Sequence, residues 1–101
     1  MNPPDRIALG FSPSSYPLLK RLKSRGHANL IVLTPGAASE LDLTVEEVWV
    51  ENPYEAFHRF WSSGTTFLVV GAIGAVIRII APLLKGKDND PSVLVLSLIH
   101  I

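Results

Sequence analysis

Residues 67–85 read FLVVGAIGAVIRIIAPLLK, and this stretch decides how the chain folds. It opens on a continuous apolar run, and after Gly71 the apolar residues recur with a helical period instead of a strand-like one. The residues of this second part are Ala72, Ile73, Val76, Ile77, Ile80 and Leu83. The pattern predicts a buried strand that turns at Gly71 into a helix whose apolar face packs on a sheet.

The other face of the expected helix carries small residues and a single cation. Its members recur at three- and four-residue steps: Gly71, Gly74, Ala75, Arg78, Ala81 and Pro82. The N–H groups at a helix start attract anions, and Arg78 could add a guanidinium, so this face could bind an anionic group. The alternative is that the glycines only permit tight packing and Arg78 reaches into solvent. Spacing alone favours that alternative, because neither GxGxxG nor a P-loop is present.

A membrane-spanning helix is a third possibility for residues 67–84, which are almost wholly apolar. Arg78 lies near the middle of that segment, where an arginine costs roughly 2.5–3.5 kcal/mol on insertion. Pro82 and two glycines also interrupt it. A strand followed by a helix avoids this cost, so we expect no membrane association.

Strand and helix patterns alternate along the rest of the chain. Strands are expected at residues 6–11, 29–33, 48–50 and 91–96, and helices at 13–25 and 53–61, with a possible helical turn in 37–44. Ser12 and Asn52, each followed by proline, are the expected N-caps. A fresh turn or kink is expected at Pro82. This order predicts an α/β fold: three layers, with a mainly parallel sheet flanked by helices and incomplete at its C-terminal end.

Ligands of parallel sheets bind beyond the carboxyl ends of the strands, which here are residues 10–15, 34–36 and 71–74. The predicted substrate-binding residues are therefore Ser12, Gly71, Ala72, Gly74 and Arg78. Ser12 and its neighbouring serines fit helix caps better than nucleophiles, because no GxSxG elbow surrounds them.

Composition excludes several classes of function. Nine basic and nine acidic residues balance, which argues against nucleic acid as a partner. The absence of cysteine excludes disulfides and thiolate chemistry and suits a cytoplasmic protein. No targeting peptide is apparent at the N-terminus. The histidines at 27, 58 and 100 are scattered, and Asp88 and Asp90 occupy a turn without the rest of a calcium loop, so no metal site is expected.

The stretch GAIGAVIRIIAPLLKGKDNDPSVLVL, residues 71–96, resembles the signature of the N-terminal domain of the cobalamin biosynthesis protein CbiG, cobalt-precorrin-5A hydrolase. That family combines a small-residue turn, a V-x-R-x-I-A-P-L-L-K helix, a K-x-x-D-P turn and a valine-rich strand. The matching residues here are Val76, Arg78, Ile80, Ala81, Pro82, Leu83, Leu84, Lys85, Lys87, Asp90 and Pro91. The earlier part of the chain agrees with the family only in layout.

The resemblance implies a role in building the corrin ring of vitamin B12. The family's enzyme opens the ring-A lactone of cobalt-precorrin-5A and releases acetaldehyde, and no catalytic residue carries over. The implied partner is a precorrin, a tetrapyrrole whose carboxylates Arg78 could hold; its cobalt belongs to the substrate, and no cofactor is expected in this part of the protein. Residues 6–22 resemble the start of fusions with precorrin-3B C(17)-methyltransferase, which would use S-adenosylmethionine. The alternative is a non-catalytic corrinoid-binding module.

The end of the sequence departs from the family pattern. Residues 96–101, LSLIHI, resemble translated transposase-adapter DNA rather than the family's polar turn and Gly- and His-containing loop. We therefore expect residues 1–95 to be a truncated CbiG-like N-terminal domain and residues 96–101 to be a non-native tail. A fragment of this kind is expected to be inactive alone.

Overall fold

A parallel sheet organises the computed structural model, which describes residues 5–41, 48–86 and 89–96. Its strands are β1 (Arg6–Gly10), β2 (Leu30–Leu33), β3 (Trp49–Val50), β4 (Thr66–Val70) and β5 (Ser92–Leu96). They lie in the order β3-β2-β1-β4-β5, and every neighbouring pair is parallel. The helices are α1 (Tyr16–Ser24), α2 (Pro35–Ser39), α3 (Pro53–Phe60) and α4 (Ile73–Ile80), with short 3-10 helices η1 (Pro13–Ser15) and η2 (Ala81–Leu83).

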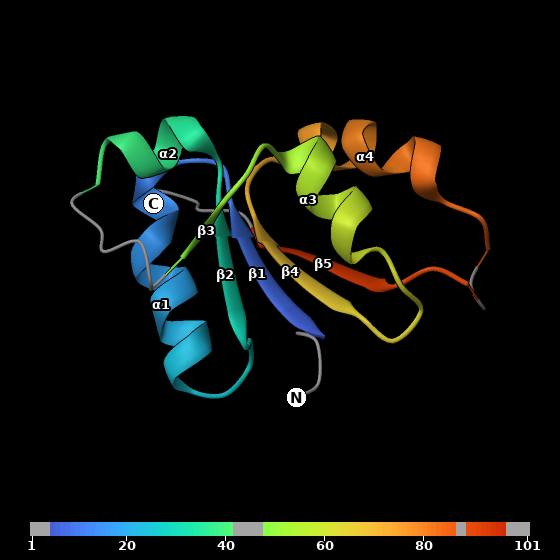
Figure 1. The fold of residues 1–101 in the computed structure, drawn as a ribbon, viewed down its shortest axis with the longest axis horizontal. Helices are drawn as coiled ribbons and strands as arrows, with labels where there is room; N and C mark the ends of the chain where they lie inside the picture. Colours follow the sequence, from blue (N-terminus) through green and yellow to red (C-terminus); the bar gives the residue numbers. More distant parts are fainter. Residues whose placement is uncertain (1–4, 42–47, 87–88, 97–101) are drawn as a thin grey trace.

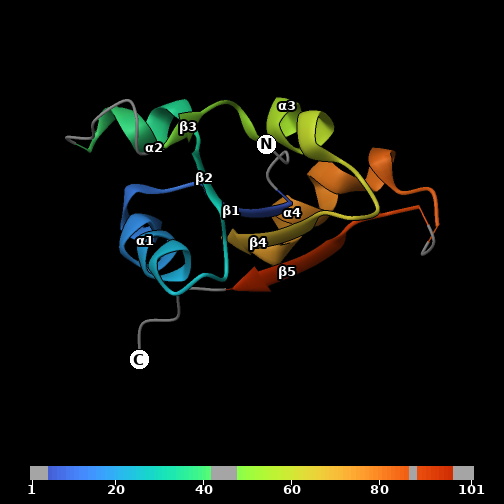
Figure 2. The same cartoon turned by 60° about the horizontal axis from the view of Figure 1, so that its bottom comes forward.

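Helices cover both faces of the sheet, so the expected α/β architecture is confirmed (Figures 1 and 2). One core lies under α3 and α4 and includes Ile7, Leu9 and Phe67. The other lies under α1 and α2 and includes Ala8 and Leu33. Successive residues of a strand point to opposite faces, so Ile7 and Ala8 enter different cores.

The stretch at residues 67–85 divides as predicted into strand β4 and helix α4. Pro82 does not lie inside α4, because a separate 3-10 turn, η2, starts at Ala81 and takes the proline in its first turn. None of the helices in the described ranges combines the length and the apolarity needed to cross a membrane.

The buried side of α4 differs from the expected one. Val76, Ile79 and Ile80 are buried, whereas Ile73 and Ile77 are 59% and 54% exposed. Apolar residues extend over so much of the α4 circumference that periodicity could not choose the packed side. Contact with α3 and β5 selects the side of Val76 and Ile80, which corrects the sequence-based assignment.

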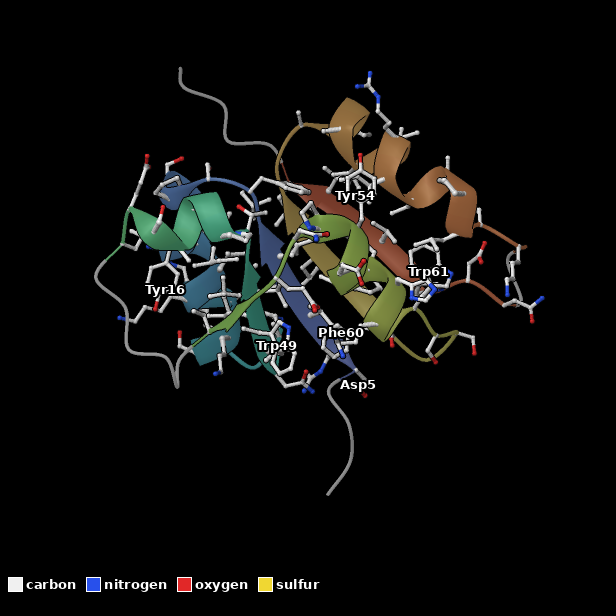
Figure 3. All side chains as sticks on the ribbon, turned by 45° about the horizontal axis from the view of Figure 1, so that its top comes forward. Asp5, Tyr16, Trp49, Tyr54, Phe60 and Trp61 are labelled. Atoms are coloured by element: carbon white, nitrogen blue, oxygen red, sulfur yellow. The ribbon has the colours of Figure 1, made fainter. Side chains whose placement is uncertain are left out.

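Helix α3 begins where the sequence predicts it to begin. The Asn52 side chain accepts a hydrogen bond from the backbone N–H of Glu55, at 2.9 Å. Phe57 is fully buried, but Tyr54 is 59% exposed, so the aromatic residues of α3 do not all face the core. Trp49 of β3 lies edge-on against Phe60, with ring centroids 6.2 Å apart (Figure 3).

The prediction that the Ser12 side chain caps a helix is wrong. The Ser12 side chain caps no helix N–H, and the chain enters α1 through η1. The backbone carbonyl of Ser12 instead accepts hydrogen bonds from Ser15, through its N–H at 3.1 Å and its Oγ at 2.5 Å. The expected turn at residues 37–44 starts earlier, as α2, and residues 42–44 lie outside the described ranges.

Candidate functional site

The three loops predicted to form a site do converge at one edge of the sheet. Gly10, the last residue of β1, pairs with Leu33 at the end of β2 and with Val70 at the end of β4. The loops that follow therefore leave the sheet at the same level (Figure 1). This edge is where parallel sheets bind ligands.

Position 71 has room only for glycine, because an aromatic ring lies against it. A Cβ atom at this position would come within 2.6 Å of Cδ2 of Phe11, which belongs to the loop after β1. The Gly71 N–H is also occupied, since it donates to the Leu96 carbonyl at 3.1 Å. Gly71 thus joins two loops of the site by close packing, and its own N–H is already used within the sheet.

The start of α4 has no capping side chain. Its N-cap residue, Ala72, has no side-chain acceptor for the first N–H groups of the helix, which have no intrahelical acceptor either. Ala72 and Gly74 are exposed, and no described residue lies within 4 Å of the position that a Cβ atom of Gly74 would take. Toward the described residues, the helix start thus presents uncapped N–H groups and the positive end of the dipole, which suit an anionic group.

Arg78 lies one turn beyond Gly74 on the same side of α4. Its side chain is exposed, and it makes no hydrogen bond or ion pair with a described residue. The exposed Ile73 and Ile77 adjoin these two residues. We call Ile73, Gly74, Ile77 and Arg78 the α4 outer face, which presents two aliphatic side chains next to an unpaired guanidinium.

Ser12 lies in the β1–α1 loop next to Phe11, the residue that contacts Gly71. Its hydroxyl is 3.0 Å from the Oγ of Ser14 and is partly buried. The structure thus brings the loop of Ser12 to the turn of Gly71 and Ala72.

Ser15, which was predicted to be a helix cap, instead packs against Gly10. It is fully buried, and its Oγ would lie 2.2 Å from a Cβ atom at Gly10. The sequence analysis did not predict this close approach of Ser15 to Gly10, which only the structure shows.

Asp90 of the K-x-x-D-P turn holds the chain after α4. Its carboxylate accepts hydrogen bonds from the backbone N–H groups of Lys85 and Gly86, at 2.9–3.0 Å. Desolvation raises the pKa of Asp90. The opposing effects are larger in sum: hydrogen bonds from the N–H groups of Gly86 and Lys85, and the nearby side chains of Trp61 and Lys85. The pKa of Asp90 therefore lies below its ordinary value. The buried Nε1 of Trp61 has no hydrogen-bond partner among the described residues.

Acid should therefore weaken the fold through Asp90. A depressed folded-state pKa contributes stability above the unfolded-state value of about 3.9, and this contribution is lost as the pH falls through the folded-state pKa. We expect Asp90→Asn to lower the melting temperature at neutral pH and to flatten its decline below about pH 4. Thermal unfolding followed by circular dichroism from neutral to acid pH measures both effects. Glu55→Gln, at an exposed carboxylate of α3, is the control; equal pH profiles for both variants would contradict the role of Asp90.

No cluster of three or more histidine, cysteine, aspartate or glutamate side chains suited to a metal ion occurs among residues 5–41, 48–86 and 89–96. His27 and His58 are exposed. Lys87 and Asp88 of the signature, His100 and the rest of residues 97–101 lie outside the described part of the chain.

Comparison with protein families supports the resemblance seen in the sequence. Residues 55–98 match the family described as cobalamin synthesis G N-terminal, and the match includes most of α3 and all of β4, α4 and β5. Comparisons with curated proteins and with solved structures found no match. The matched segment contains the whole α4 outer face, and it connects the chain with cobalamin biosynthesis. The resemblance predicted from residues 71–96 is thus confirmed, because residues 55–98 match the cobalamin synthesis G N-terminal family.

Proposed function

We propose that this chain forms part of a corrin-ring biosynthesis enzyme that hydrolyses the lactone of cobalt-precorrin-5A and releases acetaldehyde. The observation that carries the proposal is the family match over residues 55–98 together with the exposed α4 outer face inside it. The intact enzyme is proposed to act on a tetrapyrrole and to be fused or associated with other corrin-pathway enzymes. If a precorrin-3B C(17)-methyltransferase is fused, that domain would use S-adenosylmethionine.

The chemistry of a precorrin suits the α4 outer face. A precorrin has an apolar macrocycle with acetate and propionate carboxylates at its edge. Ile73 and Ile77 offer aliphatic contact for the macrocycle, because each has more than half of its surface exposed. Arg78 can hold a carboxylate through two parallel N–H bonds, and the helix start at Ala72 and Gly74 can accept a second one.

A second function, a corrinoid-binding module without catalytic groups, is favoured by a specific feature. The predicted site residues are Ser12, Gly71, Ala72, Gly74 and Arg78. None of these side chains is a carboxylate or an imidazole, the groups that most often act as general bases for water. In this second function the substrate would be gripped here, and a base from another part of the polypeptide would activate water.

Acetaldehyde release separates the two functions. The assay uses the intact parent enzyme and a version in which the remaining domains are deleted. Release that persists after the deletion would exclude the pure binding module. Loss of release with retained precorrin binding would exclude hydrolysis by this domain alone.

Arg78→Gln is expected to weaken precorrin binding about tenfold in the intact enzyme, because a charge-assisted bond to a carboxylate contributes about 1.5–3 kcal/mol and part of it is screened at an exposed site. Equilibrium binding followed by the absorbance of the macrocycle measures the change. Lys85→Gln, which removes an exposed cation beyond η2, is the matched control and should leave affinity unchanged. Equal affinities for the wild type and Arg78→Gln would show that the carboxylate is held elsewhere.

A further inference from the structure

The charges of this neutral chain are strongly segregated. Residues 6–39 contain no acidic residue, whereas residues 40–55 contain no basic one. The cations of the first segment are Arg6, Lys20, Arg21, Lys23 and Arg25. Four of them therefore lie on α1 or directly after it. Since surface charges act over about 8 Å at physiological salt, such a cluster determines what binds to α1 even though the net charge is zero.

Lys20, Arg21, Lys23 and Arg25 are all exposed, and together they are here called the α1 basic face. None of their side chains makes an ion pair or a hydrogen bond with a described residue. Their face also lies on the side of the sheet opposite to α3 and α4, because α1 packs on the second core (Figure 2).

Two adjoining hollows lie along the α1 basic face. The first has a volume of about 320 Å³ and is lined by Tyr16, Lys20, Lys23, Ser24 and Ile31. The second, of about 480 Å³, is lined by Pro17, Lys20, Arg21, Ser24 and Arg25. Lys20 and Ser24 line both, so the two hollows lie on the two flanks of the ridge that these residues form along the helix. The lining of the first hollow combines Tyr16 and Ile31 with the side chains of two lysines.

We propose that the α1 basic face is a docking site for an acidic polypeptide segment that carries an aliphatic side chain. The carboxylates pair with Lys20, Arg21, Lys23 and Arg25, and the aliphatic side chain enters the hollow beside Tyr16 and Ile31. Two neighbouring hollows with basic residues in both linings fit a linear segment that spans them better than a compact metabolite.

Charge complementarity selects a polypeptide over a larger polyanion. A nucleic acid or an anionic membrane would extend past the α1 basic face and meet the rest of the protein, where acidic residues balance the basic ones. A short acidic segment contacts only the basic face. Neither a phosphate backbone nor a lipid headgroup supplies the aliphatic side chain that the first hollow accommodates.

Fluorescence anisotropy with a labelled peptide rich in glutamate and leucine tests the proposal on the full chain. Binding is expected to weaken with added salt, and a lysine- and leucine-rich peptide should not bind. The double variant Lys20→Glu, Lys23→Glu should weaken binding at least about fivefold, because it removes two attractive charges and adds two repulsive ones. Lys85→Glu is the control; it reverses an exposed cation on the α4 side and should bind the peptide like the wild type.

Other results would overturn the proposal. They are equal affinity for both peptides, an unchanged affinity in the Lys20→Glu, Lys23→Glu variant that retains its circular dichroism spectrum, and tighter binding to duplex DNA or phosphatidylserine vesicles than to the acidic peptide. Sedimentation that shows self-association abolished by the same variant would identify a second copy as the occupant and exclude an acidic partner. These outcomes are independent of precorrin binding, so the proposed function can fail while this docking site stands.

Discussion

Phe57→Ala is expected to lower the free energy of unfolding by about 3–5 kcal/mol, which is much of the stability of a domain of this size. Phe57 is fully buried, and its ring centroid lies 4.8 Å from that of Phe67 and 6.2 Å from that of Trp61. Truncation removes buried apolar surface and leaves a cavity that the neighbouring rings can fill only in part. Urea unfolding followed by circular dichroism measures the loss.

A control in the same helix separates packing from helix propensity. His58 is exposed on α3, so His58→Ala removes little buried surface and should change stability by less than about 0.5 kcal/mol. A loss below about 1 kcal/mol for Phe57→Ala would contradict the close packing of α3 on β4. Phe57 belongs to the core on which α4 also packs, so the loss of its ring is also expected to loosen α4.

Gly10→Ala is expected to cost about 1–3 kcal/mol through overpacking. The added Cβ atom would lie 2.2 Å from Oγ of Ser15 and 2.7 Å from Cδ1 of Leu19, both closer than real contacts allow. Ser15 cannot turn aside without cost, because its Oγ donates to the Ser12 carbonyl and the side chain is fully buried. The melting temperature of the purified chain reports the effect.

Two further variants make the Gly10 prediction specific. Gly64→Ala adds the same atom where nothing lies within 4 Å, so its stability should stay close to that of the wild type. Adding Ser15→Ala to Gly10→Ala removes the hydroxyl that clashes and should recover part of the loss. Additive effects of the two substitutions would show that residues 10 and 15 do not share this contact.

Much of the fold was predictable because its signals are local. Residues 67–70 are apolar without alternation, as in a strand buried on both faces, and Asn52 with the proline after it marks the start of α3. Pro82 marks the change from α4 to η2 for an equally local reason, since its ring cannot follow an uninterrupted helix.

The site was less predictable, because its contacts join distant segments. The spacing of Gly71, Gly74 and Arg78 predicted that they lie in one turn and helix after a strand, and the structure places them after β4 and on α4. It could not show that Phe11 lies on Gly71, or that the Gly71 N–H is used by Leu96. The glycines therefore differ in role: Gly71 serves packing, and Gly74 is open.

The sequence by itself determined the order of strands and helices, the parallel sheet and the resemblance to the cobalamin synthesis G N-terminal family. These depend on patterns within single segments, whose periods and caps are set by backbone geometry. Only the tertiary structure decided which side of α4 is buried, because isoleucines and valines lie on most of its circumference and the packing of α3 and the sheet selects Val76 and Ile80. The same selection leaves Ile73 and Ile77 beside Arg78 at the surface, since a helix packed on one sheet can bury only one side.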